Sequence, residues 1–198
     1  MKPELIKKLK LELQGSESDY IRDLNEIVKI FDRDRINFKA LIEQKPHEAV
    51  IQEFLEKHPA ILLHAMLDGF YTVATFRSCL FAKVRLGEDY ETDFLYCSGN
   101  SMGMYWTFVE LERSDVPLFN QAGDPSKHLS HALRQTLDWQ SWLQDNKAYA
   151  EKKLGEMLNE TTGRRWPEQF RKQSRSLIVI GRRQSLTKQT NRLRAQLC

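Results

Sequence analysis

The stretch YETDFLYCSGNSMGMYWTFVELERS, residues 90–114, predicts two β-strands joined by a turn that contains glycine. Its β-branched and aromatic residues favour strands over 91–97 and 104–112. Asp93, Glu110 and Glu112 interrupt these otherwise apolar runs. The hairpin therefore combines a pair of core strands with three carboxylates whose role needs an explanation.

The alternation of side chains along a strand brings these acids together. Residues two apart share a face, so Glu110 and Glu112 point the same way and Arg113 points the opposite way. If Asp93 pairs close by, three negative charges converge, which raises at least one pKa substantially. Mg²⁺ or Mn²⁺ suits such hard oxygen ligands, and a metal of this kind supports phosphodiester hydrolysis. The same spacing also fits a structural interpretation, in which Asp93 caps a strand end and 110–113 is the polar edge of an amphipathic strand.

The elements around this hairpin define the fold class. We expect a short helix over 45–59, strands over 71–76 and 79–86, one long helix over 126–158 that crosses the sheet, a buried strand over 176–181 and a last helix over 185–197. This order predicts an α/β fold, a mixed sheet flanked by helices with at least one parallel pair of strands. No internal repeat interrupts it.

Composition limits the class of protein. The chain has 198 residues, 41% of them hydrophobic, which is enough for one substantial core. We interpret residues 1–44 as an N-terminal helical appendage, for packing or oligomerisation, because apolar residues recur there at helical spacing. Three cysteines without CxxC spacing, no apolar leader and no long apolar run predict a cytoplasmic protein without membrane contact.

The C-terminal part of the chain is strongly basic. From residue 163 onward Glu168 is the only acid, whereas ten residues are lysine or arginine. The bland interpretation is a solvated basic face, and the alternative is contact with a polyanion such as the DNA backbone. The candidates for backbone contact are Arg164, Arg165, Arg171, Arg182 and Arg183.

Four blocks of sequence carry a family resemblance. They are HEAVIQEFLEKHPAIL (47–62), ETDFLY (91–96), WTFVELERSDVPLF (106–119) and HLSHALRQTLDWQSWL (128–143). Together they resemble the catalytic domain of the Shedu anti-phage defence nucleases, within the PD-(D/E)xK superfamily. The resemblance implies a restriction-endonuclease-like core over 45–198. It also implies a further strand after residue 197, so we expect the domain here to stop short of the family's C-terminal end.

The resemblance also implies roles for single residues. Glu48 would be the acid of the first core helix, Asp93 the acid of the second strand, Glu110 the first acid of the acid-x-Lys motif, and Gln135 the glutamine of the next helix. Glu112 stands where the superfamily usually has lysine. Its carboxylate could bind metal or act as a general base, or its presence could leave the site slow or inactive. His128 and His131 are expected on a solvated helix face rather than at a zinc site.

Three functions follow for comparison. The first is a metal-dependent DNA endonuclease that acts as effector of a bacterial anti-phage system, with Mg²⁺ or Mn²⁺ held by Glu48, Asp93, Glu110 and Glu112, and Gln135 near the attacking water. The second is a catalytically impaired protein that binds DNA or senses DNA ends, and the third is an assembly scaffold. The resemblance further implies a homo-oligomer, a dimer or a tetramer.

Overall fold

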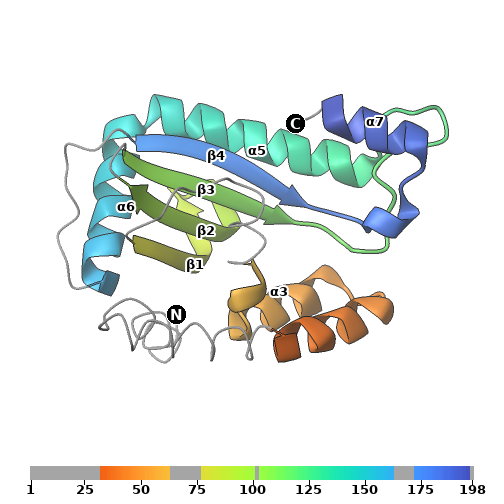
Figure 1. Cartoon of the computed structure of the whole chain (residues 1–198). Helices are drawn as coiled ribbons and strands as arrows, with labels where there is room; N and C mark the ends of the chain where they lie inside the picture. Colours follow the sequence, from red (N-terminus) through yellow and green to blue (C-terminus); the bar gives the residue numbers. More distant parts are fainter. Residues whose placement is uncertain (1–31, 63–76, 101–102, 163–171, 197–198) are drawn as a thin grey trace.

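The structure, a computed structural model, describes residues 32–62, 77–100, 103–162 and 172–196 (Figure 1). A helix over residues 32–43 leads to α3 (Glu48–Lys57), β1 (Arg77–Leu86), β2 (Tyr90–Asn100), β3 (Gly103–Leu111), α5 (Lys127–Asp145), α6 (Lys147–Thr162), β4 (Lys172–Val179), a short 3₁₀ helix (Arg183–Ser185) and α7 (Lys188–Gln196). The strand predicted over 71–76 and the first part of the helical appendage lie outside the described residues.

The four described strands form one mixed sheet in the order β1-β2-β3-β4. β1 with β2 and β2 with β3 are antiparallel, whereas β3 with β4 is parallel. A parallel neighbour needs a crossover connection, and α5 with α6 supplies it. The predicted α/β class and the parallel pair are confirmed.

The crossover differs from the single helix predicted over 126–158. α5 begins after its N-cap Ser126, whose Oγ accepts from the backbone N–H of Leu129 at 3.2 Å, and it ends at Asp145, with Asn146 as its C-cap. Both the backbone N–H and the side-chain amide of Asn146 donate to the carbonyl of Trp142, at 2.9 Å and 3.0 Å. Asn146 therefore closes α5, and α6 begins at the next residue.

Helices cover both faces of the sheet (Figure 1). On one face, Phe81, Leu95 and Phe108 pack against Trp139 of α5 and against α6. On the other face, Ile51 and Leu55 of α3 pack against strand residues. The 32–43 helix packs against the same cluster. A third cluster, around Leu118, Phe119 and Leu129, holds the loop after β3 against α7. The sheet is thus the middle of three layers.

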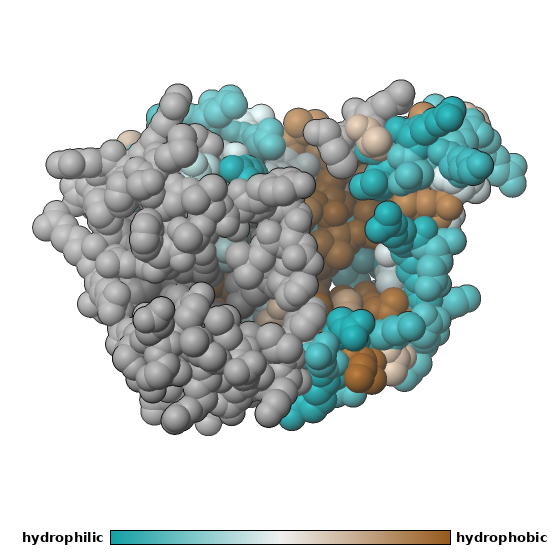
Figure 2. Space-filling view, viewed as in Figure 1, coloured by the Kyte–Doolittle hydropathy of each residue, from teal (hydrophilic) through white to brown (hydrophobic). Residues whose placement is uncertain are grey.

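Two local predictions need correction. β4 was expected to be a buried strand, but it is the edge of the described sheet, and Val179 is 38% exposed. Figure 2 shows apolar side chains in a hollow between α7 and the 32–43 helix, where β4 runs in Figure 1. The helix predicted over 45–59 begins later, because the N-cap of α3 is His47, whose Nδ1 accepts from the backbone N–H of Ala49.

The packing of α5 predicts that substitutions at two of its positions change the free energy of unfolding by very different amounts. Trp139 is 1% exposed and Leu137 is 61% exposed. We expect Trp139→Ala to lower the free energy of unfolding by about 3–5 kcal/mol, because the lost ring leaves a cavity that the sheet cannot fill. The matched control Leu137→Ala should change it by less than about 0.5 kcal/mol. Urea denaturation measures both, and equal losses would contradict the assignment of this helix face to the core.

Candidate functional site

The candidate site lies where β2 and β3 stop pairing. The backbone ladder between them runs from Asn100↔Gly103 to Phe94↔Val109. Asp93 and Glu110 are the next residues beyond that last pair, one on each strand. Here Oδ2 of Asp93 accepts from the backbone N–H of Leu111 at 2.7 Å. A side chain thus satisfies a donor of β3 at the point where the strands separate.

Asp93 is also tied to β1 and to α3. Its Oδ1 accepts from Nζ of Lys83 at 2.5 Å. Its backbone carbonyl accepts from the side-chain amide of Gln52 at 3.3 Å, and that amide also donates to Glu56 at 2.8 Å. Because Glu48 and Gln52 are four residues apart on α3, they lie on the same side of the helix. The contact through Gln52 therefore brings Glu48 toward the two strand acids.

The acids act on one another strongly. Burial raises the pKa of Glu110 from 4.5 to about 8, and the charges of Asp93, Glu48 and Glu112 add to this effect. Burial likewise raises the pKa of Glu48, with further contributions from Asp93 and Glu112, against the opposing charges of Lys83 and His47. The four acids named from the sequence therefore gather in one electrostatic environment.

Glu112 follows the last residue of β3 and meets the start of α5. Its Oε2 lies 3.1 Å from Nδ1 of His128, and its Oε1 lies 3.7 Å from Nδ1 of His131. Both rings are solvent-exposed on one side, as expected, but they also face this carboxylate. Sequence reasoning missed this pairing, although the three-residue spacing of the two histidines on a helix was a usable signal.

Gln135 lies further along the same flank of α5, four residues after His131. It is half-buried, and its Oε1 is buried without a hydrogen-bond partner among the described residues. A buried amide oxygen without a donor is costly, so the side-chain carbonyl of Gln135 is available to accept a further hydrogen bond. No described contact joins Gln135 to the acids.

The basic candidates are placed unequally. Arg164, Arg165 and Arg171 lie outside the described residues. Arg182 donates to a carboxylate oxygen of Glu43 at 3.0 Å and also to the backbone carbonyl of Ile42. This guanidinium is thus engaged by the 32–43 helix, whereas Arg183 is exposed.

The acids suit a divalent cation by their donor chemistry, since oxygen ligands and excess negative charge favour Mg²⁺ or Mn²⁺. Within the described ranges, no three His, Cys, Asp or Glu side chains are placed so that together they could hold a metal ion. Mg²⁺, however, commonly uses one or two carboxylates and takes its other ligands from water and substrate phosphate. Asp93 and Glu110, on either side of the strand opening, fit such an open site.

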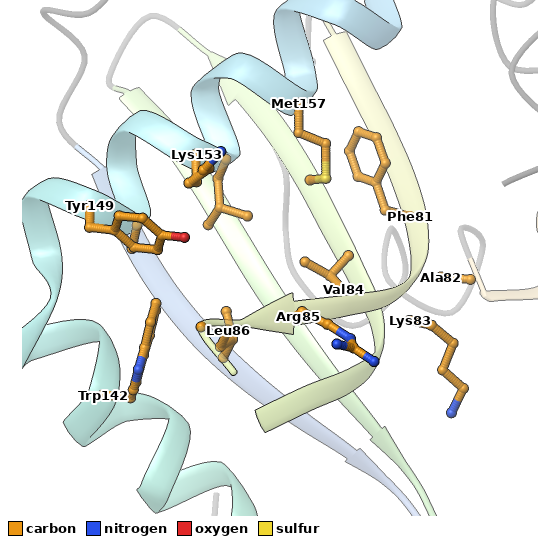
Figure 3. Close-up of a pocket in the computed structure, with 13 residues that line it drawn as sticks. Phe81, Ala82, Lys83, Val84, Arg85, Leu86, Trp142, Tyr149, Lys153 and Met157 are labelled. Carbon is orange, nitrogen blue, oxygen red and sulfur yellow. The ribbon is translucent and has the colours of Figure 1, made fainter. Parts of the chain in front are cut away.

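A separate cavity of about 430 Å³ lies between β1 and the α5–α6 pair (Figure 3). Its lining includes Trp142, Tyr149 and Lys153, and no carboxylate belongs to it. Figure 3 shows Phe81 and Val84 on the cavity side of β1, whereas Lys83 points away from the cavity. The cavity and the acidic site are therefore on different sides of this strand.

The fold and the site define a mixed α/β domain with a carboxylate cluster at the opening between two central strands. Residues 45–198 match the family described as Shedu protein SduA, C-terminal. The chain belongs to this family, a component of anti-phage defence. Comparison with curated proteins and with solved structures gave no match. Along the described ranges, no helix is long and apolar enough to cross a bilayer.

The pKa of Glu110 predicts a pH-dependent stability. Because this pKa is about 8 in the folded chain against a usual 4.5, the folded state keeps a proton that the unfolded state loses. The stability linked to that proton is fully present below the usual pKa of 4.5, and it is lost as pH rises through the folded-state pKa of about 8. We expect Glu110→Gln to raise the free energy of unfolding by about 1–3 kcal/mol at high pH, and by little at low pH.

Thermal unfolding between about pH 5 and pH 9 measures this difference. The control Glu88→Gln, at an exposed turn residue, should follow wild type throughout. A wild-type protein that gains stability relative to Glu110→Gln as pH rises would contradict the burial of Glu110 among acids.

Proposed function

We propose that this chain is a metal-dependent DNA endonuclease that acts as an effector of anti-phage defence. The observation that carries the proposal is the convergence of Glu48, Asp93, Glu110 and Glu112 at the opening between β2 and β3, where burial and mutual repulsion raise the pKa of two of them. A divalent cation relieves that repulsion. The family assignment supports the same activity.

The topology supports the finer fold assignment. Within the described residues, a helix, three antiparallel strands, a helical crossover and a parallel fourth strand follow one another, in agreement with the order predicted from the sequence. The acids stand on the first helix of that order, on its second strand and at the end of its third strand. We therefore infer a restriction-endonuclease-like core, with Mg²⁺ or Mn²⁺ as the metal.

The residues of the site would have different roles in the reaction. Asp93 and Glu110 would hold the metal, and Glu48 would add negative charge from α3. When bound, the metal polarises a phosphoryl oxygen and makes a water more acidic. Glu112 would accept the proton of the attacking water. His128 and His131 lie against its two oxygens and position this carboxylate. Gln135 offers a carbonyl oxygen that can orient a water.

The alternative is a protein that binds DNA or DNA ends without cleaving them. It is favoured by the lack of a ready ligand group of three side chains within the described part of the chain, and by glutamate at position 112. In both proposals DNA is the partner, exposed arginines such as Arg183 contact its backbone, and copies of the chain assemble into a dimer or a tetramer.

Cleavage of supercoiled plasmid in Mg²⁺ or Mn²⁺ tests the nuclease proposal. We expect wild type to nick the plasmid and Asp93→Asn to be slower by at least about 10²-fold, because the substitution removes a charge on which the site depends. Glu88→Gln should be as active as wild type. DNA binding without cleavage in either metal would favour the alternative, and neither binding nor cleavage would favour a scaffold.

Metal binding has a readout that does not require cleavage. At pH 9, where the acids repel most strongly, we expect Mg²⁺ to raise the melting temperature of wild type, because the ion binds the folded state. Asp93→Asn should lose most of this increase, since the site then lacks one of its main carboxylates. An equal response to Mg²⁺ in the two proteins would place the ion elsewhere.

A further inference from the structure

Lys83 breaks the alternation of β1. It has a φ of 51°, in the left-handed region that a residue with a side chain rarely adopts. Phe81 and Val84, three residues apart, both belong to the core on the α5–α6 face. Figure 3 shows Ala82 and Lys83 together on the other side of the strand. The backbone thus gives up regular strand geometry here, and Lys83 leaves the face that simple alternation would give it.

The kink directs Lys83 to one acid. Ala82↔Phe94 and Val84↔Thr92 are paired in the ladder, so Lys83 and Asp93 stand opposite each other between these pairs. The ammonium group reaches Oδ1 of Asp93 at 2.5 Å. Strained backbone of this kind persists where the surroundings enforce it, often at functional sites.

The ammonium group has capacity left after this contact. The Lys83 side chain is 44% exposed, whereas that of Asp93 is 10% exposed. A lysine ammonium has three N–H donors, and the contact with Asp93 uses one of them. Lys83 is also the lysine whose charge acts on both Glu48 and Glu110. A positive group therefore stands at the solvent side of the acidic cluster.

The chemistry of the proposed reaction needs such a group. Four carboxylates around one divalent ion leave a net negative site, which repels a phosphodiester. Attack on the phosphate adds further negative charge to its oxygens in the transition state, and preorganised cations stabilise that charge. Within the acid-x-acid stretch from Glu110 to Glu112 the chain supplies no cation.

We propose that Lys83, from β1, is a catalytic residue of this site: it holds Asp93 through one N–H and presents the other two to the phosphate group that is cleaved. The inference rests on the proposed nuclease function. It assigns the positive charge of the reaction to a strand that none of the sequence motifs included.

Three variants test this role. Lys83→Met removes the charge at nearly constant length, and Lys83→Arg keeps it. Arg85→Met is the matched control, because Arg85 is on the same strand, 77% exposed, and its charged neighbour is Glu91 at 3.6 Å.

Single-turnover cleavage of supercoiled plasmid in Mg²⁺ is the first measurement. We expect Lys83→Met to be slower by about 10²-fold at saturating protein, the usual loss when one donor to transition-state charge is removed. Lys83→Arg should keep most of the rate, and Arg85→Met should cleave like wild type. Lys83→Met that cleaves as fast as wild type overturns the role of Lys83 and leaves the nuclease proposal standing.

Thermal unfolding with and without Mg²⁺ is the second measurement. Without divalent ions, Lys83→Met should melt below Arg85→Met, because Asp93 loses its counter-ion, and Mg²⁺ should raise its melting temperature more than that of wild type. Equal Mg²⁺ responses overturn the inference. If Lys83→Met does not fold, Lys83→Gln, which keeps a hydrogen bond without the charge, replaces it. A wild-type protein that cleaves nothing overturns the nuclease proposal, and the role of Lys83 with it.

Discussion

The buried carboxylate of Asp93 is the constraint on which the rest of the site depends. One carboxylate oxygen accepts a hydrogen bond from the backbone of β3, and the other accepts one from Lys83 of β1. The backbone carbonyl of Asp93 accepts a hydrogen bond from the side-chain amide of Gln52 on α3. A carboxylate removed from water must find such partners, because an unpaired one costs several kcal/mol. Its contacts tie three strands and a helix together at the place where the ladder between β2 and β3 ends.

The division of the core explains why acids can exist there. Two apolar clusters, one on each face of the sheet, provide the burial that stabilises the domain. Glu110 is near the end of β3 and Glu112 directly follows it, where the backbone N–H of Glu112 donates to the carbonyl of Val179 on β4. The strands thus end in a region that is buried enough to strengthen electrostatic interactions. The same position accounts for the high pKa of Glu110.

Much of this arrangement could be predicted from the sequence, and the predictions that were wrong or missing have physical reasons. The alternation of side chains along the strands identified β2 and β3 and predicted that the acids lie close together. The order of helices and strands along the chain predicted the crossover. The break at Asn146 was missed because no glycine or proline marks it, and the hydrogen bonds that end α5 are local to that asparagine. Lys83 was missed because a left-handed lysine within a strand has no sequence signal. The exposure of β4 depends on its being an edge, which a run such as SLIVIG does not reveal.

The contact between Arg182 and residues 42–43 has a consequence for where the domain can be cut. The family match begins at residue 45, yet both acceptors of this mostly buried guanidinium lie just before it. A shortened chain that started at the family boundary would leave Arg182 charged and without those acceptors, beside a β4 edge stripped of its neighbouring helix. The structural unit therefore extends beyond the matched residues and includes the helix over 32–43.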